Sequence, residues 1–271
     1  MDVEHDSDVE HDVIEVGTLA QEEEFRSAIE LLRRLVPEHE FSTFDLGMSP
    51  ATVYTHLVTL WLITLQRLGG GVTLAETVKE LKLRHSDLLP ENKRVRKGSL
   101  SDNTAAFSRA RSRLPVEMVE RFAKRVAQSL IEQLPRCFGE RRVFVLDGTT
   151  ITLEPTSPLK KLYPPAKNQF GESVWPVLQL LVAHELRSGV AWIPELGAMY
   201  GDGNTSEAKL AAAIVTRIPN GSVVMGDSGF GIFGVLWATR SAGHDVLFRL
   251  TKQRFRSLVR GAQPLEPGFE I

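Results

Sequence analysis

Two hydrophobic runs that each lead directly into an aspartate are the feature that most restricts the fold of this chain. "VFVLDGTT" places Asp147 after one run, and "VVMGDSGFG" places Asp227 after the other. Short runs of Val, Leu and Phe bounded by glycine and polar residues are typical of buried strands. Ligands of open α/β sheets bind beyond the carboxyl ends of the strands. If the two strands are neighbours, we expect both carboxylates at the same edge of the sheet.

The chain beyond Pro135 carries the pattern of a mixed sheet. Three strands in succession are followed by a helix with Thr205 as its cap, a strand that ends at Asp227, a second helix and a final strand, "DVLFRL". This order differs from the regular alternation of a doubly wound fold. We therefore predict a mixed α/β sheet in which Asp147 ends the first strand and Asp227 ends the fourth.

Helical signals dominate from Glu22 to about Gln133, which predicts an all-α domain of four or five helices. The expected helix starts are marked by three pairs of residues, Ser49 with Pro50, Thr73 with Glu76, and Ser99 with Asp102. A further helix is expected to bury one stripe at helical spacing, made of Val116, Val119, Ala123, Val126, Leu130 and Leu134.

Charge is distributed unevenly along the chain, although the formal net charge is only −2. Residues 1–40 hold 13 acidic residues and 3 arginines, so an acidic tail precedes a basic body. Helices are expected at 74–83 and 101–113. About seventeen residues separate them, which is too many for the turn of a helix-turn-helix. The basic residues here either bind DNA phosphates or form a solvated charged face, and they are Lys93, Arg94, Arg96, Lys97, Arg109, Arg111 and Arg113.

Two neighbouring carboxylates would suit Mg²⁺ or Mn²⁺, which bind one or two carboxylates together with waters and substrate phosphates. Such metal ions activate a nucleophile and stabilise the leaving oxygen of a phosphodiester. Taken singly, Asp147 and Asp227 are equally compatible with turn or helix-cap residues. Glu207 reads as a first-turn residue that complements its helix dipole. The sequence contains no P-loop, HExxH, CxxC or GxSxG motif.

A single cysteine, Cys137, excludes a disulfide framework within the chain. There is no signal-peptide pattern and no apolar run near 18 residues, so a cytoplasmic protein without a membrane segment is expected. The repeated "DVEHD" at the N-terminus offers loose metal ligands or, alternatively, a disordered acidic tail.

Several segments, in order, resemble the DDE transposases of bacterial insertion sequences, the group typified by insertion sequence four. "VFVLDGTTI" resembles the strand of the first aspartate, and "YPPAKNQFG" resembles the basic loop that follows the second strand. "GNTSEAKLAAAIV" resembles the helix before the second aspartate, whose own strand and following helix resemble "VVMGDSGFGIFGVLWATRSAGHDVLFRL". Upstream, "NTAAFSRARSRLP" is similar to the helical segment before the catalytic core. The resemblance covers about residues 99–255.

The resemblance implies an RNase H-like core in which two aspartates and one glutamate hold divalent metal ions, Mg²⁺ or Mn²⁺. Such enzymes cut double-stranded DNA at transposon ends and join the 3′-hydroxyl to target DNA. Asp147 and Asp227 match the two aspartates as catalytic and metal-binding residues. The resemblance further implies a homodimer on DNA, associated with the bacterial nucleoid when bound, and DNA contacts by Lys160, Lys161, Arg249, Lys252 and Arg254.

The sequence departs from the family pattern at the third acid, which should lie in a Tyr-x-x-Arg-x-x-x-Glu-x-x-x-x-x-x-Lys signature. No such signature is present. We therefore expect a truncated transposase that lacks the third acid or, alternatively, a non-catalytic DNA-binding regulator at transposon ends. A third reading completes the site with a local acid, Asp202 or Glu207.

The predicted fold class is α+β, with an all-α domain followed by an RNase H-like mixed sheet that is incomplete at its C-terminus. The expected organisation is an acidic disordered tail at 1–21, a helical DNA-binding domain at 22–135, a partial catalytic core at 141–255, and the start of a missing insertion or tail at 256–271.

Overall fold

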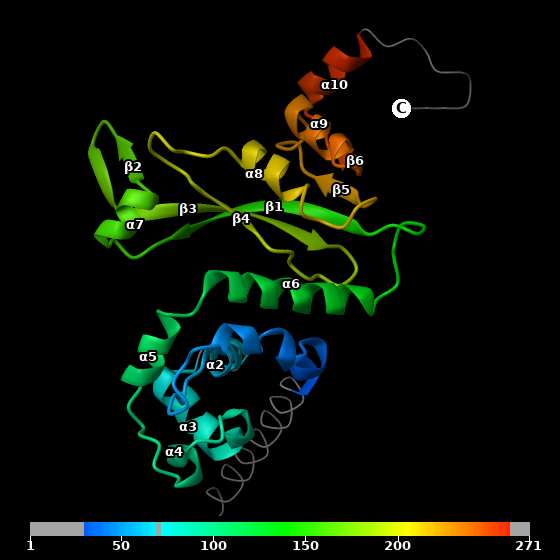
Figure 1. Cartoon of the computed structure of the whole chain (residues 1–271). Coiled ribbons are helices and arrows are strands. Elements are labelled where there is room, and N and C mark those ends of the chain that lie inside the picture. The colour runs from blue at the N-terminus through cyan, green and yellow to red at the C-terminus, as the bar shows by residue number, and fades with distance from the viewer. Residues whose placement is uncertain (1–29, 69–71, 261–271) are drawn as a thin grey trace, which may run out of the picture. The chain divides into compact units, whose positions relative to one another are not determined.

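The computed structural model describes residues 30–68 and 72–260 and confirms an α+β protein, helical first and sheet-forming second (Figure 1). The chain divides between Val126 and Ala127 into two compact units, called here the helical unit and the sheet unit. The predicted acidic tail at 1–21 and the last residues of the segment at 256–271 lie outside the described residues.

Short helices form the helical unit. Residues 30–35 are helical, and the elements that follow are the 3₁₀ turns η1 (Glu38–Glu40) and η2 (Ser42–Asp45), α2 (His56–Leu68), α3 (Leu74–Arg84), η3 (Ser86–Leu88), α4 (Lys93–Arg96), α5 (Ala105–Arg111) and the first part of α6 (Val116–Glu132). Aromatic rings hold this unit together, since Trp61 and Phe41 both meet Phe122 edge-on, with ring centroids 5.6 and 6.1 Å away.

One of the three predicted helix starts is confirmed. Thr73 accepts a hydrogen bond from the backbone of Glu76, whose carboxylate accepts one from the backbone of Thr73 in return, and this capping box opens α3. The start at Ser49 and Pro50 is wrong, because α2 begins only at His56. Asp45, eleven residues upstream, accepts a hydrogen bond of 2.7 Å from the backbone of His56 and supplies the missing partner.

The start predicted at Ser99 and Asp102 is also wrong. Helix α5 begins at Ala105, and the Asp102 carboxylate instead accepts a hydrogen bond from Lys82 of α3. Lys82 also donates to the backbone oxygen of Leu100, at 2.9 Å. The side chain that looked like a cap therefore fastens the segment before α5 to α3.

The stripe predicted for α6 is displaced around the helix. Val116 is 67% exposed and Leu134, beyond the helix end, is 37% exposed. The buried residues also follow helical spacing, and they are Met118, Phe122, Ala127 and Ile131. Both stripes satisfy the same period, so the bulky Phe122, which packs on Trp61, decides which face is buried.

The sheet unit contains one mixed sheet with strand order β2-β3-β1-β5-β6, and β4 pairs with β3 as well. β1 is antiparallel to β3 and parallel to β5, which is in turn parallel to β6. Three antiparallel strands followed by two parallel ones give the RNase H-like arrangement. The strands are β1 (Val143–Thr152), β2 (Pro165–Asn168), β3 (Gly171–Glu185), β4 (Glu195–Ala198), β5 (Val223–Gly226) and β6 (Asp245–Phe248).

Within the described part of this unit, the end of α6 (from Ala127) and four further helices accompany the strands, α7 (Ser157–Leu162), α8 (Glu207–Ile214), α9 (Phe233–Ser241) and α10 (Lys252–Val259). α8 and α9 lie side by side on one face of the sheet (Figure 1). The core combines strand residues such as Phe144 and Leu181 with Leu210 and Ile214 of α8. This packing fixes the start of α8 next to the middle of β1.

Candidate active site

Asp147 and Asp227 come from neighbouring parallel strands. The ladder between β1 and β5 ends at the pair Val145 and Met225, and each aspartate lies two residues beyond its member of that pair. The same register therefore brings the two aspartates opposite each other. Both are exposed, as a site for a solvent-borne substrate requires.

The prediction that Asp147 ends its strand is wrong. β1 continues to Thr152, and Asp147 pairs with Val182 of β3 in the middle of the strand. The partner strand β5 stops at Gly226 because the chain turns immediately after it. Asp147 thus lies where β1 loses its parallel neighbour, and this boundary creates the edge that the sequence pattern suggested.

The loop that follows β5 and carries Asp227 is held in place by two sets of hydrogen bonds. The Asp227 side chain accepts a hydrogen bond of 2.8 Å from the backbone of Gly229, which forms a tight Asx turn. Arg254 of α10 donates from Nη1 to the backbone oxygens of Ser228, at 2.7 Å, and Gly231, at 3.2 Å. Two independent anchors therefore fix the orientation of the Asp227 loop.

Glu207 is the third carboxylate of this region. It lies in the first turn of α8, where the Ser206 side chain accepts a hydrogen bond from the backbone of Lys209 and caps the helix. A side-chain carbon built on Gly148 of β1 would lie 1.8 Å from Glu207 Oε1, so Glu207 occupies space that only a glycine leaves open. A carbon built on Gly229 would lie 3.0 Å from Asp227 Oδ1 and 3.8 Å from Glu207 Oε2.

Electrostatics support the grouping of the three acids. Partial burial raises the pKa of Glu207, and the charges of Asp227 and Asp147 raise that pKa further. In the part of the chain that the structure describes, no hydrogen bond to the Glu207 carboxylate offsets this repulsion. Asp202, the other local acid considered from the sequence, lies in an exposed turn and is not among the charges that act on Glu207.

We expect Glu207→Gln to raise the melting temperature of the metal-free protein at neutral pH. The pKa of Glu207 is higher in the folded than in the unfolded chain, so the folded state binds more protons and loses stability as the pH rises above about 4.5. The variant lacks this loss, and its advantage should vanish below that pH. Thermal melts in a chelator at pH 4 and pH 7 measure the difference.

Glu154→Gln is the matched control for that experiment, because Glu154 is an exposed acid of the same unit. It should melt like the parent protein at both pH values. Equal melting temperatures for Glu207→Gln and the parent protein at pH 7 would contradict the repulsion described here.

The donor set fits a hard divalent cation. Carboxylate oxygens are the ligands that Mg²⁺ prefers, and Mg²⁺ commonly binds through only one or two carboxylates. Asp147 and Asp227 supply that number. Within residues 30–68 and 72–260, no three or more His, Cys, Asp or Glu side chains are arranged to hold a metal ion.

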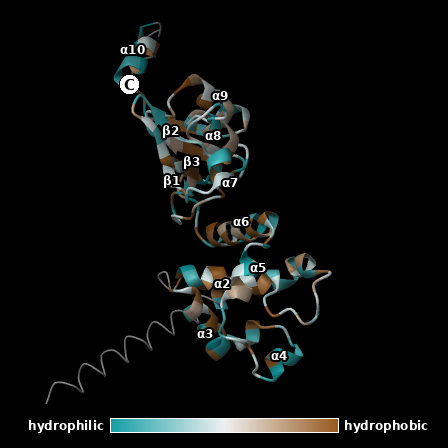
Figure 2. Cartoon of the chain, turned by 90° about the vertical axis from the view of Figure 1, so that its left-hand side faces the viewer, coloured by the Kyte–Doolittle hydropathy of each residue, from teal (hydrophilic) through white to brown (hydrophobic). Residues whose placement is uncertain are grey.

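The predicted DNA-contacting residues fall into separate groups. Lys160 and Lys161 lie on α7, Arg249 follows β6, and Lys252 begins α10. Arg254 donates hydrogen bonds from Nη1 to backbone oxygens of the Asp227 loop, a contact that was not predicted from the sequence. The basic residues of the helical unit lie on or next to α4 and α5, and α4 appears hydrophilic in Figure 2. Three of them, Arg94, Arg109 and Arg113, line one pocket.

The geometry agrees with the comparison of the chain with known families. Residues 138–264 match the family model of the transposase DDE domain. The match covers the whole sheet from β1 to β6, together with α10, and supports a DDE transposase. A transposase DDE domain implies a DNA substrate and divalent metal ions. No curated protein matches the chain. Among the described residues there is no helix of the length and apolar character needed to cross a membrane.

Sequence reasoning named Glu207 but interpreted it first as a helix-dipole residue. The missed signal is Gly148, the residue directly after Asp147 in the middle of a strand. Glycine within a strand marks a close approach of another group. Read that way, it would have pointed to a side chain packed against β1 beside Asp147.

Proposed function

We propose that this chain is a transposase that acts on transposon-end DNA by metal-dependent phosphodiester cleavage and strand transfer. The observation that carries the proposal is the register between β1 and β5, which brings the carboxylates of Asp147 and Asp227 together at one sheet edge. The match of the surrounding sheet to the transposase DDE domain supports the same conclusion.

In this proposal Asp147 and Asp227 hold Mg²⁺ or Mn²⁺. The bound metal supplies a Lewis acid that polarises the scissile phosphodiester and neutralises developing negative charge. The protein's part is to keep the two carboxylates exposed and correctly oriented. The Asx turn at Gly229 and the Arg254 bonds fix Asp227, while the ladder to β3 fixes Asp147. A fixed geometry lowers the cost of assembling the site at the moment of reaction.

DNA contacts on the sheet unit are proposed for Lys160, Lys161, Arg249 and Lys252, which supply charge without any base-reading motif. Such residues bind the phosphate backbone and set the position of the duplex. Because two copies of the site would act on the two ends of an element, we further propose a homodimer on double-stranded DNA, in the bacterial cytoplasm and associated with the nucleoid while bound.

The decisive experiment is a nicking assay with the full chain, a labelled duplex that carries the ends of the element, and Mg²⁺ or Mn²⁺. The proposal expects strand cleavage that requires the metal and stops in chelator. DNA binding is measured in parallel by fluorescence anisotropy.

The alternative is a non-catalytic DNA-binding protein that occupies transposon ends as a regulator. The basic residues of the helical unit support it, because they supply charge for DNA phosphates without a catalytic group, and three of them line one pocket. Salt-dependent DNA binding without metal-dependent nicking in the assay above would establish the alternative and overturn the transposase proposal.

A further inference from the structure

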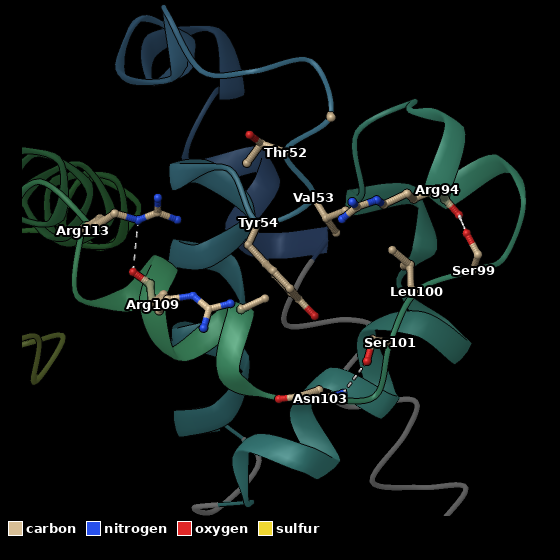
Figure 3. A pocket seen from close by; sticks show the side chains of 12 residues that line it. Thr52, Val53, Tyr54, Arg94, Ser99, Leu100, Ser101, Asn103, Arg109 and Arg113 are labelled. Atoms are coloured by element: carbon tan, nitrogen blue, oxygen red, sulfur yellow. Dashed lines mark hydrogen bonds between the residues drawn. The ribbon is translucent and has the colours of Figure 1, made fainter.

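A pocket of about 280 Å³ opens within the helical unit, far along the chain from the three acids. Its walls come from residues 51–54, from α4 and the segment that follows it, and from α5 with Arg113 just beyond (Figure 3). The polar lining consists of three arginines, Arg94, Arg109 and Arg113, together with Thr52, Tyr54, Ser99, Ser101 and Asn103. No acidic residue of the described chain lines it.

The guanidinium groups face a shared space. Figure 3 shows Arg94 reaching in from one side and Arg109 from the opposite side, with Tyr54 between them. In the described part of the chain, neither Arg94 nor Arg109 has a hydrogen bond or ion pair to its guanidinium. Arg113 donates from Nε to the backbone oxygen of Arg109, at 3.2 Å, which leaves its two terminal nitrogens free.

Buried contacts hold this arrangement in place. The side-chain oxygen of Asn92, a residue only 7% exposed, accepts hydrogen bonds from the backbones of Arg94 and Val95 and so caps α4. Its side-chain nitrogen donates to the backbone oxygen of Thr52, at 3.3 Å, and ties α4 to the opposite wall. These contacts fix the backbone from which Arg94 extends relative to the wall formed by Thr52, whereas the side chains of Arg94, Arg109 and Arg113 are themselves exposed.

Neutral donors complete the lining. Half-buried Tyr54 packs against Phe107, with ring centroids 5.7 Å apart, and in the described chain its hydroxyl has no hydrogen-bond partner. Asn103 uses its side-chain oxygen to accept a bond from Ala105, so its side-chain nitrogen is free to donate. Arginine forks with nearby neutral donors are the chemistry that recognises phosphate groups.

We propose that this pocket binds a backbone phosphate of a DNA strand, with Arg94 and Arg109 contacting it from opposite sides. A phosphodiester brings the negative charge and acceptor oxygens that the unpaired guanidiniums lack. The volume lies near the lower end of the range for small-molecule sites and leaves room for a phosphate with its adjoining sugar. The inference rests on the proposed function only for the choice of DNA as the source of the phosphate.

The test measures binding of the full chain to a fluorescent duplex by anisotropy, at salt concentrations from about 50 to about 200 mM. Arg94→Gln combined with Arg109→Gln should weaken binding by roughly tenfold or more and reduce the slope of log K against log salt by about 1, as expected for one lost phosphate contact. Arg96→Gln combined with Arg111→Gln is the matched control, because it also removes one charge from α4 and one from α5 but both lie outside the pocket.

Little change for the Arg96→Gln and Arg111→Gln control supports the pocket, whereas an equal loss for this control would overturn it in favour of a diffuse basic face. Unchanged binding by the double variant would also overturn it. Titration with inorganic phosphate and a mononucleotide identifies the source: tight binding of either one, without an effect of the variants on DNA binding, would overturn DNA as the ligand. Asp227→Asn should bind the duplex normally, so failure of cleavage and failure of this pocket give different results.

Discussion

Asp227→Asn should abolish metal-dependent nicking of transposon-end DNA while leaving DNA binding intact. The substitution keeps the size of the side chain and its acceptor oxygen for Gly229, but it removes the negative charge proposed to hold the metal. Changes in the outer shell of metal sites already cost about 10- to 100-fold in affinity or activity. Loss of a direct ligand should therefore cost at least about a hundredfold, measured as initial nicking rates in saturating Mn²⁺. Asp147→Asn should behave in the same way.

Asp202→Asn is the control, because Asp202 is an exposed acid in the turn between β4 and α8. It should nick DNA at the parent rate. Loss of nicking in Asp202→Asn would instead favour a site completed by that local acid, and full activity in Asp227→Asn would refute the assignment of the pair.

Phe144→Ala should reduce the free energy of unfolding of the sheet unit by about 3–5 kcal/mol, the usual cost of removing a buried phenyl ring. Phe144 is fully buried, three residues before Asp147 on β1, and its ring meets Trp192 edge-on with centroids 6.1 Å apart. The cavity would open at the centre of the core that α8 covers. Urea unfolding of the full chain, followed by hydrogen exchange of β1 amides, reports the sheet unit separately from the helical unit.

Phe170→Ala provides the comparison at matched chemistry, since the Phe170 ring is 88% exposed at the turn between β2 and β3. Its cost should be within about 0.5 kcal/mol of zero. A similar loss for both variants would mean that the ring at position 144 does not pack as described.

Much of the sheet could be predicted from the sequence, because buried strands contain short runs of β-branched and aliphatic residues. Val143–Leu146 and Val223–Gly226 were recognised from runs of β-branched and aliphatic residues, and the predicted helix, strand, helix and strand agree with α8, β5, α9 and β6. The order before α8 was wrong in part, because α7 separates β1 from β2 and the strand that leads to Asp227 is the fifth, not the fourth. The length of β1 was not predictable in this way. Its second half, which contains Thr149 and Thr150, has exposed residues and pairs only with β3, so the hydrophobic pattern fades while the backbone ladder continues.

In the helical unit, helix-start patterns failed where the actual hydrogen-bond partner lies far away in the sequence. The capping box of Thr73 and Glu76 was predictable because both partners lie within one turn. The start of α2 was not, because its cap comes from Asp45, and Asp102 was misread because its partner Lys82 lies twenty residues away. At the site, spacing suggested the aspartate pair, but only the packing of α8 on the sheet brings Glu207 beside them.

Arg254 links the end of the described chain to the loop that carries Asp227. Its two bonds span more than twenty residues, so α10 cannot detach without releasing the carbonyl groups of Ser228 and Gly231. Opening of the helix and loosening of the loop should therefore occur as one cooperative event, with shared protection factors in hydrogen exchange. Binding of DNA or of another protein segment to α10 would consequently restrict the motion of the loop that carries Asp227.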